Sequence, residues 1–474
     1  MNELDTTSYW RESGPLPRFP ALDRDITVDV AVIGGGITGI TAAYLLKKSG
    51  RTVALVDRRR LASVDTANTT AHLTCVTDLS LTSLEKNFGR GHAQAVWDAG
   101  RAALWRIEAN IDSEDIDCGF EWVSGWLHQP LHADGELKPD DLKKEADLAT
   151  QLGFEARFLD SVPFMNRPGI EFGGQALFHP RRYLRGLIEA ISGDGSHVFE
   201  HTNADDVQAE PLAVVAGDHR ISCGYVVVAT HTPLMGKTNI ASATLFQTKL
   251  ALYTTYAIGG RVPAGTVPRG SYWDTGDPYD YVRVDAHRDH DYVIFGGEDH
   301  KTGQEEDSRA CYARLEQRLR ALIPSIDISH RWSGQVVETN DGLPFIGESS
   351  DRQFVATGYS GNGMTFGTVA AMMATDAVSG RANPWKELFD PGRAKIKGGL
   401  WDYLKENKDY PYYLVRDRFM GAEGRSLRAL NRGEGKILEL NGERVAAYRN
   451  DAGRVTRLSP VCTHMGCLVE WNAA

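Results

Sequence analysis

One run of residues near the N-terminus constrains the fold more than any other feature of this 474-residue chain. It reads as a buried strand, a glycine turn, an apolar helix, a second buried strand and an acid, all within about thirty residues. The parts are, in order, Thr27–Ile33, a G-x-G-x-x-G turn containing Gly34, Gly36 and Gly39, Ile40–Lys48, Thr52–Val56 and Asp57.

This turn has the composition that a bound dinucleotide requires. Gly34 and Gly36 would permit a tight turn and a close approach by a pyrophosphate, and Gly39 would let the helix pack against the strand. The start of the helix would present N–H groups and a positive dipole end to the phosphates. Asp57 is placed to accept hydrogen bonds from a ribose diol. We predict a dinucleotide site, with either FAD or NAD; a glycine turn that serves packing alone is the alternative.

Composition narrows the class of partner. The chain has 52 Lys and Arg against 63 Asp and Glu, a net charge of −11 and no basic block, so we expect no nucleic-acid partner. No stretch approaches the roughly 18 apolar residues of a membrane span, and residues 1–20 lack the apolar core of a secretory signal. Four of the six cysteines are isolated in sequence, as is usual for reduced thiols. We expect a cytoplasmic protein without a membrane span.

Hydrophobic periodicity predicts mixed structure in the rest of the chain. We expect helices in 91–150, 178–191 and 312–322, a buried strand at Tyr225–Ala229, and an antiparallel sheet between 245 and 298. Beyond Pro384 the composition becomes charged and glycine-rich, which is typical of a linker. Short β-rich runs resume at Gly435.

Three separated segments resemble the flavoproteins of the D-amino-acid oxidase family. They are YVVVATHTP (Tyr225–Pro233), DGLPFIG (Asp341–Gly347) and FVATGYSGNGMTFG (Phe354–Gly367), and NTTAHL (Asn68–Leu73) resembles the family's loop beside the flavin. The resemblance covers roughly residues 25–390 and implies FAD as the cofactor. The cofactor contacts that it implies are Gly34, Gly36, Ile37, Thr38, Gly39, Asp57, Arg58, Asn68, Thr69, Thr70, Ala71, His72, Val207, Ala229, Thr230, Gly361, Gly363, Met364 and Thr365.

The second glycine turn also has a physical role of its own. Gly361 and Gly363 free the backbone, and a helix that starts near Thr365 would aim its N–H groups at the flavin O2. A tight turn that only packs a helix is the alternative. Val207 resembles the family's backbone contact to adenine, and an ordinary strand valine is almost as good an interpretation.

At one position the chain departs from the family pattern. Many amine-oxidising members carry an arginine that grips the substrate carboxylate, and Val336 occupies its place here. Without a guanidinium group, bidentate capture of a carboxylate is not implied, so simple amino-acid oxidase activity is not implied either. His72 could anchor a flavin covalently, but the position of that link in related enzymes matches Thr69, so we expect non-covalent FAD.

Candidates for substrate contact come from the β-rich region. Tyr279, Tyr281 and Arg283 have period-2 spacing and would share one strand face, which would form an aromatic and cationic wall beside the flavin. A solvated or core strand face is the alternative. Glu298, Asp299 and His300 could act as acid or base groups, although a polar turn explains them equally well. No catalytic base is assigned, because hydride transfer in this family can depend mainly on positioning.

The C-terminal segment resembles the first ligand loop of Rieske [2Fe–2S] domains. In the run C-T-H-M-G-C, Cys462 and His464 would be one ligand of each kind, and Cys467 the loop cysteine that some members pair in a disulfide. A second loop must supply the other two ligands, and the sequence reaches Ala474 without it. We therefore expect [2Fe–2S] only in a complete chain. A surface loop or an opportunistic zinc contact is the alternative.

Together these features predict an α/β fold, α+β overall. The predicted parts are a discontinuous Rossmann-like FAD-binding domain (26–90, 170–244 and 330–390), an antiparallel-sheet substrate domain (91–169 and 245–329), a linker (391–434) and a partial Rieske-like domain (435–474). The segment order, with two domains sharing the chain, follows the family resemblance.

The function that this organisation predicts is an FAD-dependent oxidoreductase. It would oxidise a small organic substrate, most simply at a C–N bond, by hydride transfer to flavin. Electrons would leave to O₂ or, in an intact chain, through a Rieske cluster to a redox protein partner. The alternatives are a C–O dehydrogenase of hydroxy acids or polyols on the same fold, and a non-catalytic electron-transfer flavoprotein.

Overall fold

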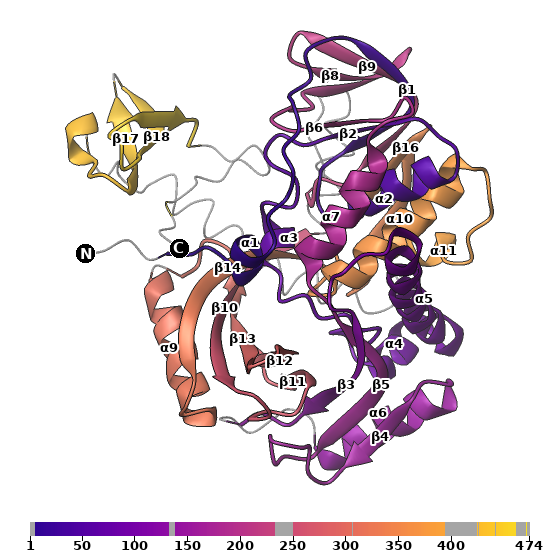
Figure 1. Ribbon diagram of the computed structural model, residues 1–474, viewed down its shortest axis with the longest axis vertical. Coiled ribbons are helices and arrows are strands. Elements are labelled where there is room, and N and C mark those ends of the chain that lie inside the picture. Colours follow the sequence, from indigo (N-terminus) through magenta and orange to yellow (C-terminus); the bar gives the residue numbers. More distant parts are fainter. Residues whose placement is uncertain are drawn as a thin grey trace.

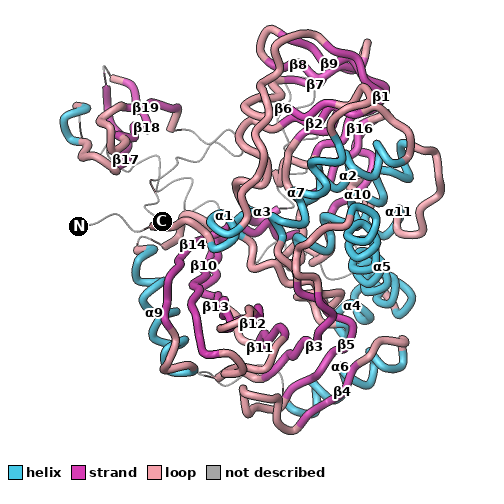
Figure 2. The backbone as a smooth tube through the Cα atoms, viewed as in Figure 1, coloured by secondary structure: helices cyan, strands magenta, loops and turns pink. Residues whose placement is uncertain are grey.

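The architecture is that of two large sheets and one small sheet in a computed structural model (Figures 1 and 2). The structure describes residues 5–131, 138–232, 250–305, 307–393, 424, 426–440, 442–460 and 471. None of the helices in these ranges combines the length and the apolar character needed to cross a membrane.

The first sheet has eight strands and is parallel at its centre. Its main order is β15 (Phe345–Ser350), β16 (Gln353–Thr357), β9 (His219–Val228), β1 (Ile26–Ile33), β2 (Val53–Val56) and β6 (His197–Phe199), and β7 (Asp206–Ala209) and β8 (Leu212–Ala216) continue from β9. All connections among β16, β9, β1, β2 and β6 are parallel. The central strand β1 is buried along its second half, which explains its continuous β-branched sequence.

Helices cover this sheet, and two of them start at glycine turns. α2 (Ile37–Lys48) follows β1 and α10 (Gly363–Val378) follows β16. They pack so closely that a Cβ on Gly367 would lie 2.8 Å from Ile37 Cγ2. α5 (Arg90–Glu114) and α7 (Pro180–Ile191) complete this layer (Figure 1). Further helices are α1 (Tyr9–Ser13), α3 (Asp65–Asn68), α4 (Leu81–Phe88), α6 (Pro139–Gln151) and α11 (Lys386–Phe389).

The second sheet also has eight strands and is almost entirely antiparallel. Its order is β14 (Asp327–Thr339), β10 (Leu250–Pro263), β13 (His290–Lys301), β12 (Tyr281–Ala286), β11 (Gly270–Asp274), β3 (Glu121–His128), β5 (Gly169–Leu177) and β4 (Ala156–Leu159). Only β11 and β3 pair in parallel. α9 (Ser308–Leu322) lies along the outer side of β10 and β13 and buries its apolar stripe against them (Figure 1).

The C-terminal region forms a small antiparallel sheet of its own. It consists of β17 (Glu434–Leu440), β18 (Glu443–Arg449) and β19 (Val455–Leu458), with a 3₁₀ turn at Leu427–Ala429. Leu430, Leu438 and Ala447 form its core. Cys462, His464 and Cys467, predicted to form a Rieske ligand loop, lie outside the described residues.

The predicted α/β fold with an antiparallel second sheet and a β-rich C-terminal part is confirmed. One prediction is wrong: the range 91–150, expected to be helical, contains the strand β3 between α5 and α6. Its sequence, EWVSGWLH, carries the aromatic and β-branched residues that suit a half-buried strand, and pairing with β11 and β5 decides its conformation.

Candidate functional site

A cavity of about 1040 Å³ lies where the carboxyl ends of the parallel strands meet the second sheet. The turns after β1, β2, β9 and β16 line one part of it, and side chains of β10 and β14 line another. Ligands of open α/β sheets bind at this edge, outside the carboxyl ends of the strands. The volume lies at the upper end of the range of roughly 300–1,000 Å³ for small-molecule sites, so a large ligand fits.

The first glycine turn is dictated by close packing as well as by access to the cavity. Gly34 has φ +105°, and a Cβ there would lie 2.4 Å from the Ala229 carbonyl oxygen. A Cβ on Gly39 would overlap the Gly34 carbonyl oxygen, so only glycine fits. At the start of α2 the Ile37 N–H donates to Thr66 Oγ1 at 3.1 Å. The turn therefore brings its backbone to the cavity wall, with no Cβ at Gly34 or Gly36 to keep a ligand away.

Asp57 holds this turn in place. Its Oδ2 accepts from the Gly35 N–H and its Oδ1 accepts from the Arg59 N–H, both at 2.7 Å. Each carboxylate oxygen has a further lone pair, so Asp57 can accept from a ligand hydroxyl at the same time. Arg58 and Arg60 line the same end of the cavity and give it positive charge.

The loop from Ala67 to Ala71 has every carbonyl oxygen bound by a side chain from elsewhere. The donors are Ser8 Oγ to Ala67, Trp332 Nε1 to Asn68, Trp10 Nε1 to Thr69, and Arg283 Nη1 to Thr70 and Ala71. Ser8, Trp10 and Arg283 are not among the residues that line the cavity, so most of these carbonyls turn away from it. The loop thus presents the side chains of Asn68, Thr69 and Thr70 to the cavity.

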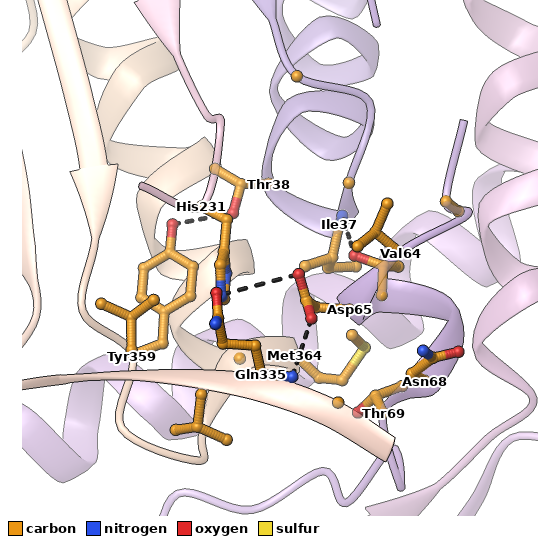
Figure 3. A pocket seen from close by; sticks show the side chains of 18 of the residues that line it. Ile37, Thr38, Val64, Asp65, Asn68, Thr69, His231, Gln335, Tyr359 and Met364 are labelled. Carbon is orange, nitrogen blue, oxygen red and sulfur yellow. Dashed lines mark hydrogen bonds and ion pairs between the residues drawn. The ribbon is translucent and has the colours of Figure 1, made fainter. Parts of the chain in front are cut away.

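A group of polar contacts joins the two sheets across the cavity wall. Asp65 Oδ1 accepts from the Gln335 N–H of β14 at 2.9 Å, and its other oxygen lies 3.7 Å from His231 Nε2. Figure 3 shows Asp65 between these two residues. Nearby, the Thr38 hydroxyl lies 2.9 Å from the Tyr359 hydroxyl. The cavity is therefore built from both sheets rather than from the first sheet alone.

The second glycine turn leaves the start of α10 open. Gly361 has φ +79°, and Asn362, the N-cap residue, makes no side-chain cap hydrogen bond. A Cβ on Gly363 would meet nothing within 4 Å. The first N–H groups of α10 are therefore accessible to a ligand. Thr365 is different, since its hydroxyl donates to the Thr74 carbonyl oxygen at 2.8 Å.

The end of the cavity beneath the second sheet is lined by acids and tyrosines. Asp78 Oδ2 and the Tyr279 hydroxyl both lie near the Gly361 turn, 2.6 Å and 3.2 Å from where a Cβ would be. The ring centroids of Tyr279 and Tyr281 are 5.7 Å apart. Asp299 lines the same end.

Burial perturbs the titratable groups at this end. Burial raises the pKa of Asp299 to about 6, and the pKa of Asp78 lies well above its ordinary value because of burial and the nearby Glu338 and Asp299 carboxylates. Burial, with the Arg283 charge, lowers the pKa of His72 to about 3, so that imidazole stays neutral. Perturbed acids in a cleft are typical of functional sites.

Most of the predicted residues meet at this cavity. Those that line it are Gly34, Gly36, Ile37, Thr38, Asp57, Arg58, Asn68, Thr69, Thr70, His72, Ala229, Thr230, Tyr279, Tyr281, Asp299, Gly361, Gly363 and Met364. Those that do not line it are Gly39, Ala71, Val207, Thr365, Arg283 and Glu298. Gly39 still serves the turn through packing.

Two candidates for substrate contact have other partners. Arg283 is 1% exposed, bonds Asp285 and the Phe178 carbonyl in addition to the loop, and lies over the Trp10 ring. Its guanidinium group is thus fully engaged by protein, which the period-2 pattern could not show. Glu298 forms ion pairs with Arg314 and Arg318 of α9. Neither side chain reaches the cavity.

Sequence reasoning missed Asp78, Asp65 and the N-terminal arm. Asp78 follows a run without a recognisable motif, and only the fold brings it beside Tyr279. Residues 1–20 form an arm that carries no recognisable motif, yet Trp10 within it is 1% exposed. The signal that could have found it is a Trp next to Tyr9 in an otherwise polar segment, since such aromatic residues are usually buried.

Comparison with known proteins agrees with this geometry. A family model described as FAD dependent oxidoreductase (DAO) matches residues 29–377, which is most of the chain. The chain belongs to this FAD-dependent oxidoreductase family. It is therefore an enzyme of the DAO type, and FAD is its family cofactor.

Relatives of this DAO-type enzyme extend over its whole length. It is 32% identical over 472 residues to "Putative Rieske 2Fe-2S iron-sulfur protein YhfW" of Bacillus subtilis (strain 168), covering 98% of this chain and 91% of the relative. It is 22% identical over 435 residues to "Gamma-glutamylputrescine oxidoreductase" of Escherichia coli (strain K12), covering 88% and 99%. Glycine oxidase from Geobacillus kaustophilus has a similar fold, with a TM-score of 0.65, 17% identity and coverage of 78% and 100%.

The residues present fit FAD on structural grounds. Asn68 Oδ1 and Ser360 Oγ are buried and have no hydrogen-bond partner among the described residues, yet both side chains line the cavity. Buried polar atoms of native proteins are nearly always satisfied, so these two indicate a ligand with polar atoms. The open start of α10 adds N–H donors for an anionic group.

Proposed function

We propose that this enzyme oxidises a small organic substrate at a C–N bond with FAD as cofactor. The observation that carries the proposal is the continuity of one cavity from the first glycine turn to the acids and tyrosines below the second sheet. One part has the donors that a dinucleotide needs, and the other has acceptors that an amine needs. The printed name of the Escherichia coli relative, an oxidoreductase of an amine derivative, supports the same reaction class.

The residues that would hold FAD fall into two groups. Near the first turn these are Gly34, Gly36, Ile37, Thr38, Gly39, Asp57 and Arg58, with Val207, Ala229 and Thr230 from neighbouring strands. Near the second turn these are Asn68, Thr69, Thr70, Ala71, His72, Gly361, Gly363, Met364 and Thr365. Within this set Gly39, Ala71, Val207 and Thr365 would act through packing or backbone, since their side chains do not line the cavity.

The chain's own residues would prepare the substrate. Bound FAD supplies the hydride acceptor that oxidation of a C–N bond requires. An amine must be neutral at nitrogen before its α-carbon can give up a hydride, so an ammonium substrate needs a proton acceptor. Asp299 is placed for this role, because with a pKa of about 6 its carboxylate is ionised at neutral pH and can hold that proton. The Tyr281 hydroxyl lies 2.9 Å from the Thr255 hydroxyl, within hydrogen-bond distance. Tyr281 held in this way would position the substrate nitrogen beside Asp299.

The electrons would leave to O₂ or, in an intact chain, through a Rieske cluster that Cys462 and His464 help to hold. The name of the Bacillus subtilis relative supports such a cluster. A redox protein would then be the partner that receives the electrons.

The division of the chain into domains is likewise a proposal. β5 and β14 are both strands of the second sheet, although most of their residues fall in segments predicted for FAD binding. We therefore propose FAD-binding segments at 26–90, 178–232 and 340–390, with the second sheet as the substrate domain.

Anaerobic titration tests the proposed reaction. The FAD-loaded protein is mixed without oxygen with matched amines, alcohols and hydroxy acids, and the visible flavin band is followed. Bleaching by amines alone supports C–N oxidation. Bleaching by alcohols or hydroxy acids would show C–O oxidation instead, and reduction by dithionite alone would show a non-catalytic flavoprotein.

A further inference from the structure

The substrate end of the cavity has two carboxyl groups whose capacity to accept hydrogen bonds is not fully used by the described residues. No described residue donates a hydrogen bond to Asp78, which lines the cavity beside the Gly361 turn. Asp299 Oδ1 is buried and also has no hydrogen-bond partner among the described residues. A buried carboxylate is costly unless it is paired or hydrogen-bonded. The buried Asp299 oxygen therefore calls for a donor that a ligand brings, and Asp78, which is exposed at the cavity wall, can accept from the same ligand.

Two tyrosines form an aromatic wall between these acids. Tyr279 approaches the Gly361 turn together with Asp78, and the Tyr281 ring lies edge-on to His72 with centroids 5.7 Å apart. Tyr281 is held by the Thr255 hydroxyl on the neighbouring strand β10. Aromatic rings attract cations through their faces, so this wall and the two carboxyl groups favour the same sign of charge.

The charge of every titratable group at this end points the same way. The negative charge of Asp299 helps to raise the pKa of Asp78, and the pKa of Tyr279 is raised by burial and by these two carboxylates, so its hydroxyl keeps its proton. His72 stays neutral. The arginines that line the cavity, 58, 59 and 60, follow β2 at the opposite, nucleotide end. The potential at the substrate end is therefore negative.

Part of the remaining lining at this end is apolar. Leu250, Leu252 and Val336 project from β10 and β14 into the cavity. Val336 stands where the family pattern would have an arginine, so this wall offers hydrocarbon contact at that position. A substrate with an apolar chain on one side and a positive charge on the other matches both walls.

We infer that the substrate is an organic ammonium ion, primary or secondary, with an apolar chain and no carboxylate next to its nitrogen, and that Asp78 and Asp299 determine this specificity. The inference rests on the proposed C–N oxidation and names its substrate class. On binding, two N–H bonds of the ammonium group donate to the two carboxylates. One of these protons then passes to Asp299, which leaves a neutral amine and a neutral carboxyl group.

Binding of matched probes tests the charge preference apart from the redox reaction. The FAD-loaded full chain is titrated by calorimetry, without oxygen at pH 8, with n-alkylamines of three to eight carbons, with the n-alkanoates of equal length, and with the 2-amino acids of equal length. Amines should bind most tightly. Asp78→Asn and Asp299→Asn should each weaken amine binding about 10- to 100-fold, the usual loss of a hydrogen bond between charged groups. Asp289→Asn, an exposed acid of the same sheet, is the matched control and should bind amines as the unaltered protein does.

The outcomes separate the inference from the proposed function. Tighter binding of alkanoates or 2-amino acids than of amines, or full amine affinity in both Asn variants, would overturn the inference. Amines that bind tightly to the unaltered protein but never bleach the flavin would support the inferred ammonium preference and contradict the proposed oxidation. Flavin bleaching by 2-amino acids together with weak amine binding would support the proposed C–N oxidation and overturn the inferred substrate class. Loss of visible flavin absorbance in a variant would show cofactor loss, and the conservative Asp78→Glu and Asp299→Glu variants then decide, since each should restore amine binding.

Discussion

The cofactor loop and the substrate end of the cavity are built on opposite principles. In the loop Ala67–Ala71 each carbonyl oxygen has a side-chain donor, and the donors come from α1, β12, β14 and the residue before α1. At the substrate end, Asp299 Oδ1 has no hydrogen-bond partner among the described residues, and the Asp78 carboxyl group is exposed at the cavity wall. The first arrangement fixes a backbone, and the second leaves binding capacity for a ligand. The fold therefore preorganises the cofactor loop, whereas the hydrogen bonding of the substrate end is completed only when a substrate binds.

The largest effect should come from removing the central donor of the loop. Arg283→Met takes away the partner of the Thr70 and Ala71 carbonyls and leaves the Asp285 carboxylate without its ion pair. We expect a loss of about 3–5 kcal/mol in the free energy of unfolding, the usual cost of breaking a buried charge pair, together with loss of bound FAD. Thermal unfolding and the flavin absorbance of the purified protein measure both.

Arg283→Lys serves as the companion variant. It keeps the charge but cannot reach the same set of acceptors, so it should lie between Arg283→Met and the unaltered protein. Unchanged stability and flavin content in Arg283→Met would show that the loop does not depend on its external donors.

The next substitution should raise the free energy of unfolding instead of lowering it. It removes the Asp299 carboxylate, whose charged form is disfavoured by burial. The pKa of Asp299 is about 6 against an ordinary value of 3.8, so the folded state binds more protons than the unfolded chain between these values. The stability cost is absent below about pH 4, grows as the pH rises and is complete above about pH 6. Asp299→Asn should therefore raise the free energy of unfolding by about 1–3 kcal/mol at pH 8 and leave it unchanged near pH 3.5.

The same variant links stability to catalysis. In the unaltered enzyme kcat/KM for an amine should rise with pH through about 6 as Asp299 ionises, and Asp299→Asn should lose this step. Thermal melts at the two pH values and a pH–rate profile check these expectations. A variant that is less stable at pH 8, or that keeps the step, would contradict the assignment.

A third experiment inverts the charge of the substrate end. Val336→Arg places a guanidinium group on the cavity wall opposite the acids. It should weaken binding of an n-alkylamine about tenfold, a modest charge effect in a partly screened site, and strengthen binding of the matched alkanoate. Val336→Met, of similar length and without charge, is the control for steric crowding. Equal losses in the Arg and Met variants would assign the effect to volume.

Much of the cofactor end could be predicted from the sequence because its signals are local. Spacing and strand–turn–helix order locate Gly34 and Gly36, and both line the cavity. Family resemblance located the Gly361 turn and the loop around Asn68, which a purely physical interpretation would have left as ordinary turns. The parts of the site that depend on backbone conformation can thus be predicted from the sequence.

The substrate end could be predicted only in part because its signals are long-range. Period-2 spacing predicted that Tyr279, Tyr281 and Arg283 share one strand face, but Tyr279 lies before β12. Arg283 contacts Trp10 from the far N-terminus, and that contact makes it a buried structural residue. Glu298 was a candidate beside Asp299, yet the two alternate, and only Asp299 faces the cavity. Asp78 had no local pattern at all. Its role follows from contacts between segments about 200 residues apart.

The smallest expected effect tests the N-terminal arm, whose contribution the sequence did not reveal. Trp10 Nε1 donates to the Thr69 carbonyl at 2.6 Å, and its ring lies under the Arg283 guanidinium group. Trp10→Phe keeps an aromatic ring but removes the donor, so it should cost about 1 kcal/mol and weaken FAD binding several-fold without changing which probes bind. Trp105→Phe, an exposed tryptophan, is the matched control and should leave both unchanged. Equilibrium dialysis of FAD measures the affinity. The hydrogen bonding indicates that the loop affects FAD binding and the substrate end affects amine binding. A Trp10→Phe variant with altered amine selectivity and unchanged FAD affinity would contradict this separation.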